Sequence, residues 1–243
     1  MSGEDQIYRQ HHEKISSFRF DSRVVSVFED MIERSVPGYA AIVGMTGELA
    51  HQYAKSHSLV YDLGCSLGAS SHAMLSWGLP ENCRLLAVDN SPEMIDELRQ
   101  RIGNWNLDSS AIELQCEDIR DLTLQPCSFV AMNFTLQFLP LEHRLPLLQR
   151  IASALLPGGA LLLSEKFRHQ DDATDALMID LHHQFKRSMG YSDLEIAQKR
   201  SALEDVLIPE SLQNHRDRLL QAGFSQVGVW FQCFNFASLI AIR

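Results

Sequence analysis

Residues 60–68, VYDLGCSLG, carry the most informative local pattern in this sequence. Its first half is an apolar run of strand length, and its second half is a glycine-punctuated turn that leads into a helical segment. Gly64 and Gly68 permit a tight turn and let the backbone approach a ligand closely. A glycine-rich turn alone is weak evidence, because dinucleotide-binding folds use a related one. The surrounding residues must therefore show which kind of ligand-binding fold this turn belongs to.

Short apolar runs alternate with segments of helical spacing through the middle of the chain. The runs of strand length are 59–63, 84–89, 111–115, 128–134 and 159–167. After the second run, Ser91 is placed to cap a helix whose first position is Pro92. Strands that alternate with helices predict a parallel sheet with helices on both faces.

The end of the chain has a different pattern. FSQVGVWFQCFNFASLIAIR, residues 224–243, contains two extended runs joined by a tight connection around Cys233 to Asn235. We expect an antiparallel hairpin that closes one edge of the sheet. The predicted fold is therefore α/β and Rossmann-like, with a seven-stranded, mostly parallel sheet and a C-terminal antiparallel hairpin.

Two segments lie outside this predicted core. Residues 1–57 have mostly helical spacing, broken at Pro37-Gly38, and residues 170–208 form a long helical insertion after the fifth strand. Such segments cover a pocket, form a dimer face or simply pack against the core. We treat residues 1–243 as a single domain with a helical N-terminal extension and a helical insertion.

Composition restricts the class of protein. The 243 residues include 31 acidic and 21 basic side chains, for a formal net charge of -10. Such a chain is repelled by phosphate backbones, which argues against direct nucleic-acid binding and favours a small-molecule partner. Five scattered cysteines with no CxxC spacing indicate cytosolic thiols, and the histidines lack metal-ligand spacing. Without a membrane-length apolar run or a signal peptide, we expect a cytoplasmic protein without a metal or a membrane association.

Polar residues at the ends of consecutive strands indicate a nucleoside site. Asp89 ends the second strand, where a carboxylate can accept both hydroxyl protons of a ribose. Asp118 and Ile119 follow the third strand, where a side chain and a backbone N–H can meet an adenine. Asn133 ends the fourth strand, and the ends of the strands share one crevice. Taken singly, a glycine is only a turn and an aspartate only a helix cap.

This constellation resembles the class I S-adenosylmethionine-dependent methyltransferase family, whose first motif is an acidic residue followed by G-x-G-x-G. The likeness covers roughly residues 58–170 and includes LLPGGALLLSE at 155–165. Ser66 stands where most members of the family have the second glycine. The chain lacks the N/D-P-P-Y motif of amino-group methylation and the Pro-Cys nucleophile of cytosine methylation, so neither reaction is indicated.

More specific motifs resemble those of the bacterial carboxy-S-adenosyl-L-methionine synthase family from about Ile7 to Arg243. They are FTLQF (134–138), SEKF (164–167), HHQFKRSMGY (182–191), KRS (199–201) and WFQCFNF (230–236). The resemblance implies that S-adenosylmethionine (SAM) and prephenate are converted to carboxy-SAM and phenylpyruvate. It also implies that a different enzyme uses the product to carboxymethylate hydroxyuridine at the tRNA wobble position. This chain would then act upstream of tRNA without binding it.

The resemblance also implies a homodimer and a set of ligand-binding residues. Arg200, which matches a carboxylate bidentately, would hold the new carboxylate and reach the ligand of the partner subunit, while Lys199 would act only as a point charge. Tyr39 would place a hydroxyl near the carboxylate or the amino-acid end. The other expected contacts are Gly64, Cys65 and Ser66 for the methionine portion, Asp89 and Asn90 for the ribose, Asp118 and Ile119 for the adenine, and Asn133 for the sulfonium side.

Alternatives remain open from the residues themselves. Arg200 one turn before Glu204 also fits a solvated helix face with an ion pair, and His182-His183 either bind the prephenate carboxylates or simply pack. An ordinary methyltransferase acting on a small carboxylate-bearing acceptor would carry the same loops. So would a noncatalytic SAM-binding regulatory protein.

Overall fold

A single seven-stranded sheet organises the chain in the computed structural model, which describes residues 3–11, 15 and 17–243. The strand order is β3-β2-β1-β4-β5-β7-β6. The first five strands run parallel, and β7 is antiparallel to both β5 and β6. The strands are β1 (Leu59–Leu63), β2 (Arg84–Asp89), β3 (Ile112–Cys116), β4 (Cys127–Asn133), β5 (Leu155–Lys166), β6 (Gln226–Cys233) and β7 (Phe236–Ile242).

The predicted sheet is confirmed, including its C-terminal hairpin. β6 and β7 are joined by a two-residue turn at Phe234 and Asn235, and Phe234 has a φ of 50°. β5 is longer than the predicted run, because it begins at Leu155 and includes the two glycines of LLPGGALLLSE. Ser91 accepts a hydrogen bond from the Met94 backbone N–H and caps a helix that begins at Pro92, as the sequence predicts.

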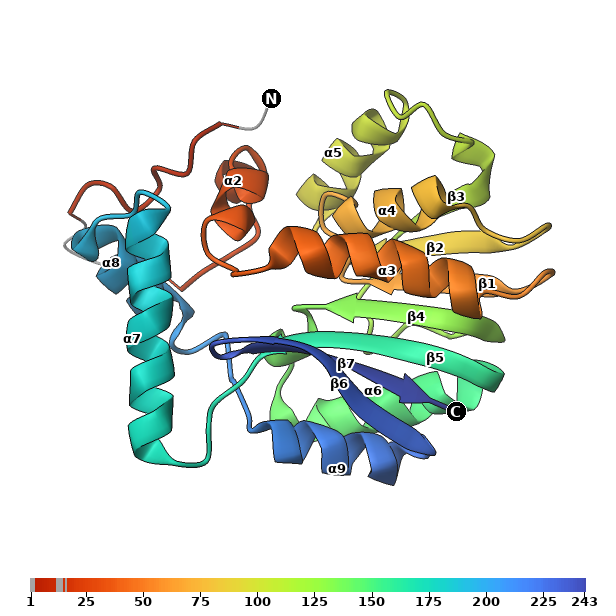
Figure 1. The fold of residues 1–243 in the computed structure, drawn as a ribbon. Helices are drawn as coiled ribbons and strands as arrows, with labels where there is room; N and C mark the ends of the chain where they lie inside the picture. The colour runs from red at the N-terminus through yellow and green to blue at the C-terminus, as the bar shows by residue number, and fades with distance from the viewer. Residues whose placement is uncertain (1–2, 12–14, 16) are drawn as a thin grey trace.

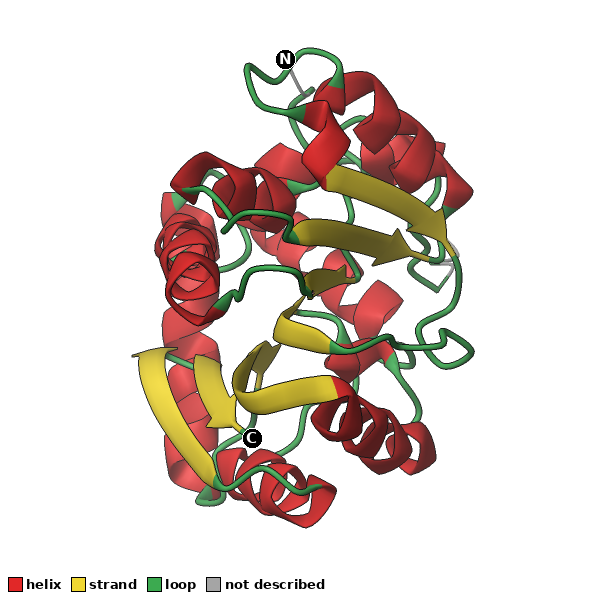
Figure 2. Ribbon diagram, turned by 90° about the vertical axis from the view of Figure 1, so that its right-hand side faces the viewer, coloured by secondary structure: helices red, strands yellow, loops and turns green. Residues whose placement is uncertain are grey.

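Helices cover both faces of the sheet (Figures 1 and 2). One face packs on α6 (Leu141–Ala154) and α9 (Leu212–Ala222), and the other packs on α3 (Tyr39–Tyr53), α4 (Ala69–Trp77) and α5 (Pro92–Ile102). Two short 3₁₀ turns are Ser109–Ala111 and Leu136–Phe138.

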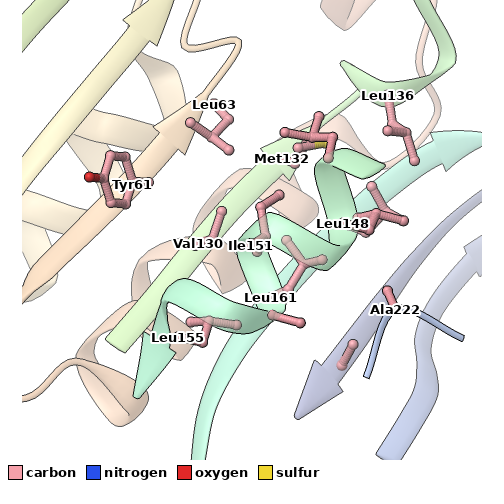
Figure 3. Packing of buried hydrophobic residues seen from close by; sticks show 14 of the residues in the cluster. Tyr61, Leu63, Val130, Met132, Leu136, Leu148, Ile151, Leu155, Leu161 and Ala222 are labelled. Carbon is pink, nitrogen blue, oxygen red and sulfur yellow. The ribbon is translucent and has the colours of Figure 1, made fainter. Parts of the chain in front are cut away.

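The core on the α6 side is built from alternate residues of adjacent strands. Tyr61 and Leu63 of β1 and Val130 and Met132 of β4 point to this face (Figure 3). Their sequence neighbours Val60 and Phe129 belong to the opposite core. Strands that are buried on both faces need continuous apolar runs, which explains why the central strands lack polar alternation.

Apart from α3, which packs on the sheet, the extension and the insertion lie beyond the carboxyl ends of the parallel strands (Figure 1). The N-terminal extension contains α1 (Ser22–Val25) and α2 (Phe28–Glu33) as well as α3, which begins after Gly38 in the left-handed conformation. Its described residues before Ser22 are not helical. The insertion contains α7 (Asp172–Ser188) and α8 (Asp193–Leu203).

Contacts with α8 hold the N-terminal segment. The Phe18 N–H donates to the Ala202 carbonyl, and the Gln198 side chain donates to the carbonyls of Tyr8 and Gln10. These bonds satisfy the backbone of an irregular segment that has no strand partner. The extension and the insertion therefore enclose the strand ends together.

Candidate active site

A cavity of about 630 Å³ lies at the carboxyl ends of the parallel strands. It is lined by the loops after β1 to β4, by the end of β5, and by residues of the extension, α7 and α8. The strand order reverses between β1 and β4, and open α/β sheets bind ligands at such a point. Nine of the ten sequence-predicted site residues line it: Tyr39, Gly64, Cys65, Ser66, Asp89, Asn90, Asp118, Ile119 and Asn133.

The loop after β1 depends on left-handed backbone. Gly64 and Gly68 have φ values of 78° and 81°, and a Cβ on Gly64 would lie 2.2 Å from the Thr135 Oγ1 atom. The close approach at Gly64 therefore involves the loop after β4, in addition to any ligand. Ser66, which replaces the usual second glycine, also has a positive φ of 51°.

Asp89 fixes this loop. Its two carboxylate oxygens each accept a backbone N–H at 2.9 Å, one from Ser66 and one from Ser91. Burial raises the Asp89 pKa, although these hydrogen bonds oppose the shift. Because each oxygen retains a free lone pair, Asp89 can still accept hydrogen bonds from ribose hydroxyls.

Asp62, the acidic residue of the first motif, lies behind the loop. Its side chain is 2% exposed and accepts a hydrogen bond of 2.6 Å from the Ser71 hydroxyl. Burial, followed by repulsion from Asp89, raises the Asp62 pKa to about 6. Asp62 does not line the cavity, so it supports the loop and α4.

Asp118 and Ile119 lie at the same end of the cavity as Asp89 and Asn90. Asp118 forms a bidentate ion pair with Arg120, which lowers the Asp118 pKa. The Asp118 Oδ1 atom also accepts the Arg120 backbone N–H, so the oxygen that can still accept an amino group is Oδ2. Within the described part of the chain, the backbone N–H of Ile119 has no acceptor, so it is available to a ring nitrogen.

Asn133 has a structural role that the sequence does not reveal. Its amide nitrogen donates to the Thr46 and Ser70 hydroxyls at 3.1 and 2.9 Å, and its amide oxygen accepts from the Ser164 hydroxyl at 2.6 Å. Both amide protons are therefore used within the protein. Asn133 lines the cavity, but its side chain is locked between α3, α4 and β5.

Tyr39 and Cys65 are uncharged at the cavity wall. Burial raises the Tyr39 pKa, and the Tyr39 hydroxyl has no hydrogen-bond partner among the residues that the structure describes. It is therefore a free neutral donor. Burial also raises the Cys65 thiol pKa well above its usual value, so this thiol is not a nucleophile.

The opposite end of the cavity carries a lysine cluster, which we define as Lys166, Lys186 and Lys199. They come from the end of β5, from α7 and from α8. Desolvation lowers the Lys186 pKa to about 7 and the Lys199 pKa to about 8. The sequence places Lys186 in a group of cations, from Lys186 to Arg200, where an anionic substrate could be held, whereas Lys166 in the motif SEKF was not predicted as a site residue.

Phe18, Phe20 and Phe138 also line the cavity and were not predicted. The Phe20 ring packs edge-on against those of Phe18 and Phe138, with centroids 5.1 and 5.5 Å apart. The Phe20 carbonyl accepts from the Ser91 hydroxyl, which joins the extension to the loop after β2. No periodic signal marks Phe18 and Phe20, because the segment that carries them is irregular, whereas Phe138 lies in the 3₁₀ turn after β4.

Arg200 is the predicted site residue that does not line the cavity of its own chain. It is exposed on α8 beside the buried Lys199, and its positive charge acts on Lys166 and His183. It forms no ion pair with Glu204 among the described residues. The alternative of an Arg200–Glu204 pair is therefore not supported.

The histidine pair divides into one packed and one half-exposed ring. His182 bonds the Ser35 carbonyl oxygen at 2.8 Å and packs edge-on against Phe236. Burial, followed by repulsion from Lys186, lowers the His182 pKa to about 3, so this ring is neutral. His182 therefore packs as a neutral ring that also lines the cavity.

The described residues contain no group of three or more histidine, cysteine, aspartate or glutamate side chains placed to hold a metal ion. None of the described helices has the length and apolar character needed to cross a membrane.

Comparison with known proteins points to one family. Residues 60–159 match the sequence family described as a methyltransferase domain. The chain is 51% identical to the carboxy-S-adenosyl-L-methionine synthase of Pseudomonas aeruginosa, over 100% of both proteins. It is 49% identical to that of Citrifermentans bemidjiense, over 98% of each, and 48% identical to that of Vibrio parahaemolyticus, over 100% of this chain and 98% of the relative.

Solved structures with the same fold are more distant in sequence. An O-methyltransferase family protein from Burkholderia thailandensis superposes with a TM-score of 0.65 at 22% identity, covering 92% of this chain and 60% of the other. Human N-acetylserotonin methyltransferase in complex with SAM gives 0.62 at 17% identity, covering 91% and 55%. These likenesses concern the fold alone.

Proposed function

This chain belongs to the carboxy-S-adenosyl-L-methionine synthase family, and we propose that it converts SAM and prephenate to carboxy-SAM and phenylpyruvate. The observation that best supports the proposal is one cavity with two chemically different ends. The loops after β1 to β3 suit a nucleoside, and the lysine cluster suits an anionic second substrate. A methyl donor alone gives no reason for Lys166 and Lys186, which have no ion-pair partner among the described residues.

The proposed reaction makes the SAM methyl carbon a nucleophile. The positive sulfur acidifies this methyl group, and loss of a proton leaves an ylide carbon. Prephenate loses carbon dioxide and hydroxide as its ring becomes aromatic. The ylide carbon forms a bond to the carbon dioxide, and the hydroxide takes the methyl proton to give water. Carboxy-SAM, phenylpyruvate and water then account for all atoms and charges.

In this proposal a group of the substrate, and not a protein side chain, removes the SAM methyl proton. The roles of three carboxylates near the site agree with this. Asp89 accepts two backbone N–H groups, and Asp118 is paired with Arg120. Glu165 is fully buried and accepts the Leu136 and Gln137 N–H groups, away from the cavity. Each of these three carboxylates therefore already has a structural role. The other acidic residues that line the cavity are Glu29, which pairs with Arg101, and the exposed Glu33 and Asp205.

We assign SAM and its product to the part of the cavity that is lined by the loops after β1 to β3, which carry Asp89 and Asp118. In this proposal, the loop from Gly64 to Ser66 lies along the methionine portion, and Asp89 and Asn90 bind the ribose. The Ile119 N–H and the Asp118 carboxylate bind the adenine. Tyr39 donates its neutral hydroxyl to a carboxylate, and the Asn133 backbone faces the sulfonium side.

Arg200 requires a second subunit in this proposal. Since it is exposed and lies outside the cavity of its own chain, we propose a homodimer in which Arg200 reaches the carboxy-SAM bound by the partner subunit. Its guanidinium would hold the new carboxylate bidentately. The site would then be complete only in the dimer.

The proposed setting is the cytoplasm. Carboxy-SAM would be the donor with which a different enzyme carboxymethylates hydroxyuridine at the wobble position of tRNA. A net charge of -10 fits a protein that makes this donor and does not bind the RNA itself.

Mass spectrometry tests the function directly. The purified protein is incubated with SAM and prephenate, and the nucleosides and keto acids are identified after removal of protein. A SAM derivative heavier by one carboxyl group, formed together with phenylpyruvate, is the expected result. S-adenosylhomocysteine as the product would instead indicate an ordinary methyltransferase, and unchanged SAM and prephenate would indicate a noncatalytic binding protein.

A further inference from the structure

Most of the lysines of this chain lie around one cavity. The sequence has five lysines, at positions 14, 55, 166, 186 and 199. Three of them, Lys166, Lys186 and Lys199, line one cavity although they come from three different elements. Lysine is rarely buried without a partner, so this convergence needs a physical reason.

Lys199 has an internal counter-ion. Its ammonium lies 3.4 Å from the Asp5 carboxylate and donates to the Ser35 hydroxyl at 2.9 Å. Asp5 is itself held by the hydroxyl of Tyr191 and by the Asp30 side chain. This arrangement ties the N-terminal segment to α8, which is a sufficient structural role for Lys199.

Lys166 and Lys186 differ from Lys199 in this respect. Within the described ranges, neither ammonium forms an ion pair or a hydrogen bond. Lys186 is 8% exposed, and Asp5 acts on it only at long range, as Asp175 does on Lys166. The other nearby charges are Lys199 and Arg200, which repel them.

Two unpaired ammonium groups in a buried cavity wall destabilise the protein unless an anion binds there. The adjoining wall is apolar. Phe236 and Phe134 line the cavity with ring centroids 6.2 Å apart, and Phe236 contacts His182, one helical turn before Lys186. A small anion attached to a flat apolar ring fits this arrangement.

We infer that Lys166 and Lys186 bind the carboxylate that prephenate keeps when it loses carbon dioxide. This group becomes the keto-acid carboxylate of phenylpyruvate. This inference rests on the proposed function, in which prephenate brings two carboxylates to the site. The lysines are specificity-determining residues for the second substrate, distinct from the residues that bind SAM.

The choice between the two carboxylates follows from transition-state binding. The carboxylate that leaves as carbon dioxide loses its negative charge as the bond breaks. A cation bound to it would stabilise the ground state more than the transition state and would slow the reaction. The keto-acid carboxylate keeps its charge throughout the reaction. Cations bound to it can therefore hold prephenate in place without slowing the reaction. The apolar wall of Phe134 and Phe236 would contact the ring.

Binding of the product phenylpyruvate isolates this carboxylate. We would titrate phenylpyruvate into the dimeric protein saturated with carboxy-SAM, and compare Lys186→Met, Lys166→Met and Lys186→Arg with the wild type. Lys55→Met is the matched control, because Lys55 is exposed before β1, where it donates to the Pro157 carbonyl. Affinity for SAM and the KM for prephenate are measured on the same variants.

The methionine variants are expected to weaken phenylpyruvate binding by about tenfold or more, as the loss of a charge-assisted hydrogen bond does. The KM for prephenate should rise in parallel, while SAM affinity stays within about twofold. Lys186→Arg should retain part of the binding, and Lys55→Met all of it. Parallel loss of SAM affinity in the methionine variants would indicate a general structural role and overturn the inference.

The outcomes also separate this inference from the proposed function. Unchanged phenylpyruvate binding in both methionine variants overturns the inference even if the wild type makes carboxy-SAM from prephenate. Absence of phenylpyruvate binding to the wild type overturns it as well. If the wild type makes no carboxy-SAM but binds phenylpyruvate through these lysines, the proposed function fails and the anion site stands.

Discussion

Replacing Lys186 with methionine is expected to stabilise the fold, whereas most changes to buried side chains destabilise it. Lys186 is 8% exposed and has no ion-pair partner among the described residues. Burial, followed by repulsion from Lys199 and Lys166, lowers its pKa from 10.5 to about 7, against a weaker opposing effect of Asp5. Methionine has a similar length and carries no charge, so it removes the desolvation penalty without leaving a large void.

The size of the effect follows from the pKa. One pKa unit corresponds to about 1.4 kcal/mol, so the shift at Lys186 costs roughly 4 kcal/mol of unfolding free energy near neutral pH. Between about pH 7 and 10.5, the unfolded lysine binds more protons than the folded one, and the wild-type unfolding free energy therefore rises with pH in this window. The advantage of Lys186→Met should shrink to roughly 2 kcal/mol at about pH 9.

Urea unfolding followed by circular dichroism between about pH 6 and 9 measures this difference. The comparison of wild type with Lys186→Met cancels contributions from groups that do not interact with Lys186, such as Glu165, whose pKa burial raises to about 8. Lys55→Met is the control and should unfold like the wild type at each pH. A less stable Lys186→Met, or an advantage that is independent of pH, would refute the view of Lys186 as a desolvated cation at the cavity wall.

Three further substitutions test other parts of the structure. Arg200→Ala should abolish binding of carboxy-SAM while SAM affinity changes much less, and calorimetry that finds equal losses would contradict the proposed role of Arg200. Gly64→Ala forces a side chain into a φ of 78° and onto Thr135, so SAM affinity should fall by about tenfold or more. Adding Thr135→Ala should restore part of that affinity, whereas an unchanged single variant would show that the loop adapts. Leu148→Ala in the α6 core should lower the unfolding free energy by about 3 kcal/mol in urea titrations without altering SAM affinity, and a loss below about 1 kcal/mol would indicate a core that collapses around the cavity.

The strands and the nucleoside loops were predictable because their signals are local. An apolar run buried on both faces, a glycine pair and a serine followed by proline each restrict the backbone within a few residues. Leu59–Leu63, Arg84–Asp89 and the helix that begins at Pro92 therefore begin and end where the sequence predicts. Asp89 and Asp118 followed from the same patterns, because the ends of parallel strands meet at one edge of a sheet.

Roles that depend on distant neighbours were not predictable in this way. Asn133 was expected to face a ligand, but its amide is bound by Thr46, Ser70 and Ser164. Those partners lie 31 to 87 residues away in the chain, and no spacing rule relates them. The irregular segment with Phe18 and Phe20 also gives no periodic signal, although it covers the nucleoside end of the cavity.

The class of sheet, the SAM-type loops and the family were readable from the sequence, since these depend on short-range backbone preferences and on motifs. Which cations are buried, paired or exposed became clear only from the folded chain. Lys166 and Lys186 lie at the cavity wall without an ion-pair partner among the described residues, Lys199 pairs with Asp5, and Arg200 is exposed outside the cavity. The reason is that burial and pairing depend on the packing of β5, α7, α8 and the N-terminal segment. Neighbouring residues such as Lys199 and Arg200, with the same charge, can therefore have opposite environments.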